Sequence, residues 1–188
     1  MSTLFDQVYE LMELSFPPSE FRIRRDQAAL LDDPRYRLLP VRHEDGALAG
    51  FMAVWELETF RFVEHLAVHP RLRGQRIGER LLTGYIGEAG GGPVVLEVEP
   101  PEGEWPERRV RFYERLGFVL NSYPYVQPPL RDGQAPLPLM LMSRPSPLAE
   151  SEFLRFRDTV YRHVYRQPAE KWPRAKMDSE RRMDRSAR

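Results

Sequence analysis

The sequence contains no cysteine, almost no lysine and no net charge. Without cysteine, the chain can form neither disulfide bonds nor a zinc site built on thiolates. Basic and acidic residues number 28 each, so no overall charge directs the chain toward nucleic acid or a membrane. Charged residues interrupt every apolar run before it reaches the length of a membrane span, and the N-terminus does not resemble a signal peptide. We therefore expect a cytoplasmic protein whose partners are neither nucleic acid nor membrane.

The chain has 188 residues, of which 41% are hydrophobic, and this matches one globular domain with a sizeable core. We expect that domain to cover residues 1–166 and to end with an amphipathic helix at 150–165. From 167 onward apolar residues become sparse and arginines accumulate. Residues 167–188 are therefore predicted to form a basic, mobile tail.

The stretch 60–82 predicts a strand, a turn and a helix. Its first part has apolar residues at a spacing of two, and the spacing becomes helical after Pro70. The strand residues expected to share one face are Phe60, Phe62, Leu66 and Val68. Two glycines, Gly74 and Gly78, lie where the spacing changes, and glycine there leaves backbone N–H groups free to converge on an anion. Arg73 and Arg76 add positive charge, which favours a ligand with more than one phosphate charge. The alternative is a strand-to-helix turn that needs glycine for geometry alone.

The remaining pattern predicts helices at 4–14, 24–31 and from Pro106 to Gly117. Strands are expected at 36–41, 47–57, 94–99 and 137–142, with a proline-rich crossing at 123–138. A hairpin signal joins the first two strands, whereas a helix precedes 94–99, so that strand can run parallel to its neighbour. The fold class predicted is α/β, with a mixed, mostly antiparallel sheet flanked by helices.

Two motifs in this order resemble the GNAT N-acetyltransferase superfamily. The segment Arg73–Gly78 is similar to the family's pyrophosphate loop, although Arg76 stands where the inner glycine is usual. The segment 112–118, Phe-Tyr-Glu-Arg-Leu-Gly-Phe, is similar to its second hallmark. The resemblance covers roughly residues 5 to 145. It implies a sheet that splays open between the strands of Leu66 and Leu96, with the helix at 150–165 as an extra element.

The resemblance implies acetyl-coenzyme A as co-substrate, bound by the loop and by backbone N–H groups of the preceding strand. The cofactor-binding residues expected are Leu66, Val68, Arg73, Gly74, Gln75, Arg76, Ile77 and Gly78. Tyr113 matches the family's general acid, and Glu97, in Leu96-Glu97-Val98, matches its base. Glu64 is a second candidate base, because an apolar strand face would raise the pKa of its carboxyl group. Ion pairing with nearby arginines is the alternative reading of both glutamates.

We expect a primary amine as acceptor, with a small molecule favoured because the proline-rich crossing leaves little groove for a peptide. Six glutamates are expected at the open end of the splay, namely Glu20, Glu64, Glu97, Glu99, Glu102 and Glu104. Tyr123, Tyr125, Pro128 and Pro129 are expected to form an apolar wall opposite. The resemblance implies that Phe16, Glu20 and Phe21, in the loop between the first two helices, contact the acceptor, and the alternative is a hydrophobic staple.

Other functions stay open at this stage. They are a protein N-acetyltransferase and a non-catalytic acyl-coenzyme A sensor or interaction module, and a homodimer is left open as the assembly. No metal site is expected, because His65 and His69 lie on a strand and a turn, where a spacing of four does not bring two imidazoles together.

Overall fold

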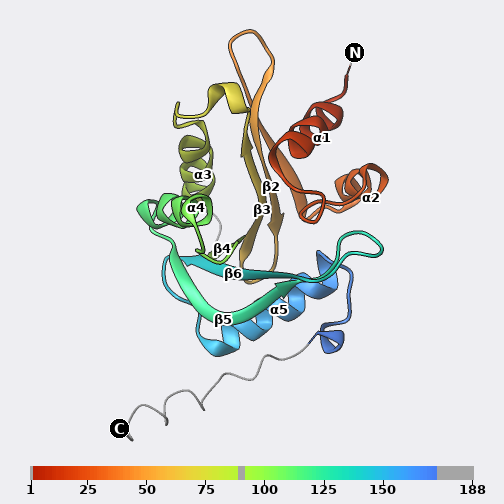
Figure 1. The fold of residues 1–188 in the computed structure, drawn as a ribbon, viewed down its shortest axis with the longest axis vertical. Helices are drawn as coiled ribbons and strands as arrows, with labels where there is room; N and C mark the ends of the chain where they lie inside the picture. Colours follow the sequence, from red (N-terminus) through yellow and green to blue (C-terminus); the bar gives the residue numbers. More distant parts are fainter. Residues whose placement is uncertain (1, 89–91, 173–188) are drawn as a thin grey trace, which may run out of the picture.

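The computed structural model describes residues 2–88 and 92–172 (Figure 1). Its helices are α1 (Leu4–Ser15), α2 (Arg24–Ala28), α3 (Ile77–Gly87), α4 (Glu104–Arg115) and α5 (Glu150–His163), with short 3-10 helices η1 (Ala29–Asp32), η2 (Pro70–Leu72) and η3 (Ala169–Lys171). Its strands are β1 (Tyr36–Arg42), β2 (Leu48–Glu56), β3 (Arg61–Val68), β4 (Val94–Val98), β5 (Val119–Gln127) and β6 (Leu137–Arg144). None of the helices described combines the length and the hydropathy that crossing a membrane requires.

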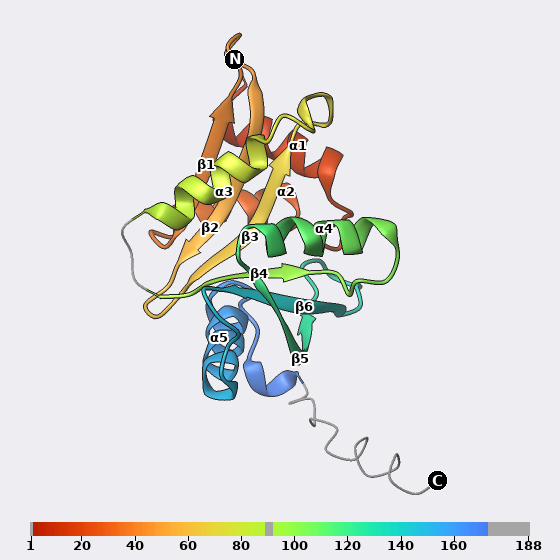
Figure 2. The same cartoon turned by 90° about the vertical axis from the view of Figure 1, so that its left-hand side faces the viewer.

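The six strands form one sheet in the order β1-β2-β3-β4-β6-β5. Only the β3–β4 pair is parallel, as expected for two strands joined through a helix. Helices α3 and α4 cover one face of the sheet, and α1, α2 and α5 lie on the other (Figures 1 and 2). The predicted fold class, a mixed and mostly antiparallel α/β sheet, is confirmed.

The sheet opens between β3 and β4. Their pairing runs only from Arg61↔Val94 to Val63↔Leu96, and beyond that point each strand continues without the other. The residues Glu64 to Val68 therefore face a gap on the side of β4. This is the splay that the resemblance implied, and it leaves strand edges available to a ligand.

A bulge in β3 changes which residues share a face. Ala53 of β2 pairs with His65 while Val54 pairs with Val63, so Glu64 is the extra residue. Because the bulge reverses the alternation, Phe62 packs with α5 whereas Leu66 packs with the α3 side. The expectation that these two residues share one face is wrong, since spacing alone does not reveal a bulge.

The segment predicted as a proline-rich crossing contains the second half of the edge strand β5. Its pairing with β6 is interrupted between Asn121 and Tyr125, and Pro124 lies in that irregular stretch. Proline is tolerated there because an edge strand or a bulge does not need every N–H group. The crossing prediction was wrong for residues 123–127.

The C-terminal part of the chain packs on the domain. Phe153, Phe156 and Val160 of α5 belong to the larger core cluster, and Phe156 contacts the rings of Phe60 and Phe62. Beyond α5, Trp172 packs against the same cluster. Residues 167–172 were assigned to the tail, and they include η3. The rest of the predicted tail, 173–188, lies outside the described residues.

Candidate active site

The loop from Arg73 to Gly78 joins η2 to α3 and borders a cavity of about 780 Å³. Gly74 has a φ of +84° and Arg76 a φ of +57°, so the loop makes two left-handed steps before the first helical turn of α3. A Cβ atom on Gly78 would lie 3.4 Å from a methyl group of Val68, so the α3 N-terminus lies close to β3. The expected loop residues line this cavity except Gln75, as do Leu66 and Val68.

Helix α4 supplies the opposite wall of the cavity. Arg108, Arg109 and Arg111 line it and bring three positive charges to this wall. Tyr113 is buried between this cavity and a second, smaller one. Burial raises the pKa of the Tyr113 hydroxyl, with Arg109 acting in the opposite sense, so the phenol holds its proton at neutral pH.

The smaller cavity, of about 190 Å³, lies at the splay and continues from the first. Both cavities are lined by Leu66, Val68, Arg73, Arg109 and Tyr113. Four carboxyl groups from three segments also line the smaller cavity: Glu20, Glu64, Glu97 and Glu99. Of the six glutamates expected here, Glu102 and Glu104 are the exceptions, since both are exposed in the turn before α4 and at its start.

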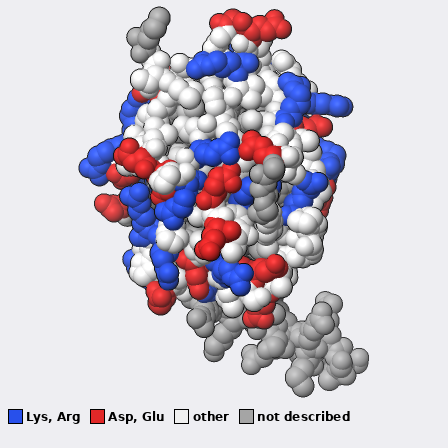
Figure 3. All heavy atoms as spheres, turned by 180° about the vertical axis from the view of Figure 1, so that it is seen from behind, with Lys and Arg blue, Asp and Glu red and all other residues white. Residues whose placement is uncertain are grey.

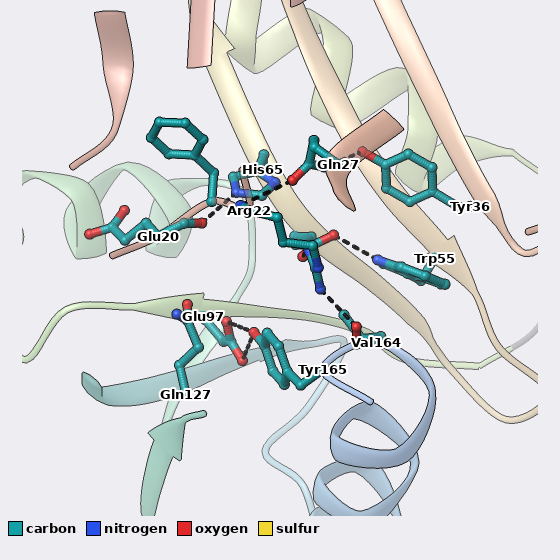
Figure 4. Close-up of polar contacts among 12 residues, drawn as sticks. Glu20, Arg22, Gln27, Tyr36, Trp55, His65, Glu97, Gln127, Val164 and Tyr165 are labelled. Atoms are coloured by element: carbon teal, nitrogen blue, oxygen red, sulfur yellow. Dashed lines mark hydrogen bonds and ion pairs between the residues drawn. The ribbon is translucent and has the colours of Figure 1, made fainter. Parts of the chain in front are cut away.

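Glu97 lies on β4 just beyond the last β3–β4 pair. Its carboxylate accepts hydrogen bonds from the hydroxyl groups of Tyr125 and Tyr165, and the Tyr165 bond is visible in Figure 4. Burial raises the pKa of Glu97 to about 7, although both tyrosines lower it and the nearby carboxylates of Glu64 and Glu20 raise it further. A carboxyl group with this pKa can take up a proton at neutral pH.

Glu64 has a different environment. Its carboxylate accepts a 2.6 Å hydrogen bond from the Arg22 guanidinium and a 2.7 Å bond from Trp55 Nε1. Burial raises the pKa of Glu64, but Arg22 together with His65 and Trp55 outweighs burial, and the pKa lies below its usual value. The predicted rise is therefore wrong. The bulge turns Glu64 toward Arg22, and the reading as an ion pair describes this residue.

The loop after α1 carries Phe16 and Glu20 to the smaller cavity. Burial raises the pKa of Glu20 to about 7, with Arg109 opposing the rise and Glu99 adding to it. Among the described residues, no hydrogen bond or ion pair is formed by the Glu20 carboxylate. Phe21, the third expected contact, is instead buried against Tyr9 and beneath the Arg131 guanidinium.

The prediction that Tyr123, Tyr125, Pro128 and Pro129 form an apolar wall of the pocket is also wrong. Tyr123 stacks on Phe153 and donates to the carbonyl group of Leu148, on the α5 side of the sheet. The hydroxyl of Tyr125 binds Glu97 instead of facing it across a pocket. Neither these two tyrosines nor Pro128 and Pro129 line the smaller cavity.

The two histidines considered as metal ligands have separate contacts. His65 Nε2 lies 2.8 Å from the carbonyl oxygen of Glu20, and His69 Nδ1 accepts from the backbone N–H of Arg71. In residues 2–88 and 92–172, no group of three or more histidine, aspartate or glutamate side chains could hold a metal ion.

Comparison with known proteins identifies the family. Residues 35–120 match the model of the acetyltransferase (GNAT) domain. The chain is 34% identical to a presumed GNAT-family acetyltransferase from Bacteroides thetaiotaomicron, with 84% of this chain and 89% of that one covered and a TM-score of 0.74. The chain belongs to the GNAT family. This GNAT protein is also 28% identical to YjbC, a presumed acetyltransferase of Bacillus subtilis (strain 168), over 87% of this chain and 84% of that protein.

A further solved structure shows how far the fold extends. An aminoglycoside 6'-N-acetyltransferase complexed with coenzyme A matches 78% of this chain and 93% of its own, at 20% identity and a TM-score of 0.56. At that identity the match shows the shared fold. As a GNAT acetyltransferase, the present protein is an enzyme of acetyl transfer.

Two residues at this site were missed by sequence reasoning, Arg22 and Tyr165. Arg22 precedes a short helix and has no spacing signal, while Tyr165 lies beyond the residues that the family motifs cover. The sequence marks Tyr165 only as one aromatic among several near the end of α5. Its contact with Glu97 arises from tertiary packing (Figure 4).

Proposed function

We propose that this GNAT enzyme transfers the acetyl group of acetyl-coenzyme A to the primary amine of a small molecule. The observation that carries the proposal is the position of Glu97, a proton acceptor with a pKa of about 7, in a small cavity that continues into a larger one lined by arginines. The larger cavity, of about 780 Å³, has a volume typical of sites that bind cofactors and small molecules. The loop amides beside Arg73, Gly74, Arg76 and Gly78 would receive the pyrophosphate.

In the proposed reaction, the neutral amine attacks the thioester carbonyl carbon, a C–N bond forms and the C–S bond breaks. Glu97 takes the proton that the amine nitrogen loses, directly or through water. Tyr113 donates its hydroxyl proton to the leaving thiolate, since both cavities meet at its side chain. Backbone N–H groups of β3 from Leu66 to Val68 would stabilise the charge that develops on the carbonyl oxygen.

The carboxyl groups of the smaller cavity support a cationic acceptor. Among the residues that the structure describes, neither Glu97 nor Glu20 forms an ion pair, whereas Glu64 is neutralised by Arg22 and Glu99 pairs with Arg109. An ammonium group would therefore find two carboxyl groups that can attract it. On the face shown in Figure 3, by contrast, basic and acidic residues are interspersed, so no patch of one sign spreads over that surface.

The closed side of the cavity supports a small molecule over a peptide. The loop after α1 is tied to the far end of the sheet by three side-chain bonds to its carbonyl groups. Gln127 donates to Ser19, Arg131 to Phe21 and Gln134 to Pro18. An extended peptide would have to break these bonds to pass on that side, while a small amine would not.

A screen of amines with acetyl-coenzyme A tests the proposal, with release of the free thiol as readout. We expect turnover with a small amine, and Glu97→Gln should lower it at neutral pH and recover part of it at high pH, where more amine is already neutral. Turnover restricted to peptides or protein N-termini would instead identify a protein N-acetyltransferase. Coenzyme binding by calorimetry without thiol release in any reaction would identify a sensor. Full activity of Glu97→Gln at every pH would remove Glu97 as base.

A further inference from the structure

Tyr165 connects the segment that follows α5 to the centre of the candidate active site. It follows α5 and lies 45 residues beyond the last residue, 120, of the matched GNAT domain. Its hydroxyl oxygen lies 2.8 Å from Oε1 and 2.6 Å from Oε2 of Glu97. The hydroxyl thus donates to a carboxylate that Tyr125 also contacts.

The backbone around Tyr165 is held in place by several contacts. Arg22 donates a 2.7 Å hydrogen bond to the carbonyl oxygen of Val164, and its guanidinium lies 5.9 Å from the Tyr165 ring. The same guanidinium is bound to Glu64, on β3. The N–H group of Tyr165 donates to Val160 within α5. Because its ring is buried and both sides of its backbone are bonded, Tyr165 has little freedom to leave Glu97.

We propose that Tyr165 is a positioning residue for acetyl transfer, and that its hydroxyl orients the Glu97 carboxylate and favours the ionised form that takes up the proton. The role rests on the proposed function of Glu97 as base. It also assigns a purpose to the segment after α5, which completes the active site in addition to covering the sheet. Arg22 and Glu64 act on Tyr165 indirectly. Arg22 donates to the carbonyl group of Val164, the residue before Tyr165, and Glu64 binds the Arg22 guanidinium.

Several charged and titratable groups face Glu97 and take part in its titration. They come from the loop after α1, from β3, from β5 and from the segment after α5, and they are Glu20, Glu64, Tyr125 and Tyr165. Tyr161 of α5 also lies near Glu97, but its hydroxyl donates to the carbonyl group of Val126. Among these, the two carboxylates oppose ionisation of Glu97, whereas the hydrogen bonds from Tyr125 and Tyr165 favour it. Loss of the Tyr165 hydroxyl should therefore raise the pKa of Glu97 above its value of about 7.

The test compares Tyr165→Phe with wild type. Phenylalanine keeps the buried ring and removes only the hydrogen bond, and thermal melting checks the fold. Titration of the Glu97 carboxyl carbon by NMR, assigned by its absence in Glu97→Gln, should move up by about one pH unit. The acidic limb of kcat/KM should move with it, so that activity falls about fivefold at pH 7 and approaches wild type near pH 9.

Tyr161→Phe is the matched control, because Tyr161 lies on α5 and donates to the carbonyl group of Val126 instead of to Glu97. It should leave the Glu97 titration within about 0.2 units of wild type. If Tyr165→Phe also leaves that titration unchanged, Tyr165 does not position Glu97. If the titration moves while Glu97→Gln keeps wild-type turnover, Tyr165 orients the Glu97 carboxylate, but the base assignment fails and with it the role of Tyr165 in acetyl transfer. The double variant Tyr125→Phe, Tyr165→Phe should shift the titration further than either single change.

Discussion

Arg22 and Glu64 form a 2.6 Å ion pair in which the side chains are only 8% and 3% exposed. The pair joins the segment before α2 to the bulge of β3, beside the splay. It explains why one of two glutamates on neighbouring strands is held ionised while the other has a pKa near neutrality. The division of roles between Glu64 and Glu97 follows from which of them has an arginine partner.

Glu64→Gln should destabilise the protein by about 3–5 kcal/mol, because it leaves the Arg22 cation buried without its counter-charge. Urea unfolding measures the change. Glu64→Gln combined with Arg22→Met should be less destabilised than Glu64→Gln alone, since the buried charge is then absent. Asp26→Asn is the control: it breaks an exposed pair with Arg25 and should cost less than about 1 kcal/mol. Equal losses for Asp26→Asn and Glu64→Gln would contradict the buried-pair account.

Gly78→Glu should weaken coenzyme binding by tenfold or more, measured as Kd by calorimetry, because it brings a carboxylate to the amides proposed to receive the pyrophosphate. Gly84→Glu, on the same helix with nothing within 4 Å of its added Cβ, should bind as wild type does. Gly78→Ala separates size from charge, since its Cβ meets Val68 at 3.4 Å. Unchanged affinity in Gly78→Glu would exclude this loop as the phosphate site.

Arg76→Gly should raise stability by about 1 kcal/mol and weaken coenzyme binding. Arg76 has a φ of +57°, a left-handed conformation that costs a non-glycine residue roughly that amount. The Arg76 side chain lines the larger cavity, where its positive charge would attract the phosphates of the coenzyme, and this attraction would offset the backbone strain. Chemical unfolding and the KM for acetyl-coenzyme A measure the two effects. A variant that is more stable and binds equally well would show that the arginine serves another purpose.

Tyr113→Phe should lower kcat by about 10- to 100-fold while leaving the Kd of the coenzyme within about twofold, because the hydroxyl acts on the leaving thiolate and not in binding. The substitution keeps the buried ring, so thermal melting should change little. A parallel loss of coenzyme affinity would indicate that the hydroxyl contributes to binding instead.

Glu20→Gln should stabilise the protein at pH 8 more than at pH 5. The folded-state pKa of Glu20 is about 7, above its ordinary value of 4.5, so folding favours the protonated form. As pH rises from about 4.5 through 7, the folded state must ionise this group and stability is lost. Removing the charge should recover on the order of 1–2 kcal/mol at pH 8. Thermal melting at the two pH values checks the sign, and the KM for the amine should rise because a contact with the cation is lost.

Local patterns in the sequence predicted most of the fold. Apolar spacing marked α1, α3, α5 and the central strands, because periodicity records which face of each element is buried. Edge strand β5 was missed because Pro124 and the two prolines after the strand resemble a loop, and the bulge at Glu64 was missed because one extra residue leaves no mark in an alternating pattern.

The sequence by itself determined the family, the glycine-containing loop and the roles expected of Glu97 and Tyr113, since these depend on residues that are neighbours in the chain. Only the tertiary structure decided the protonation of the two glutamates. Arg22 lies 42 residues from Glu64, and Tyr165 lies 68 residues from Glu97. A pKa depends on burial and on charges a few ångströms away, and packing of distant segments supplies both.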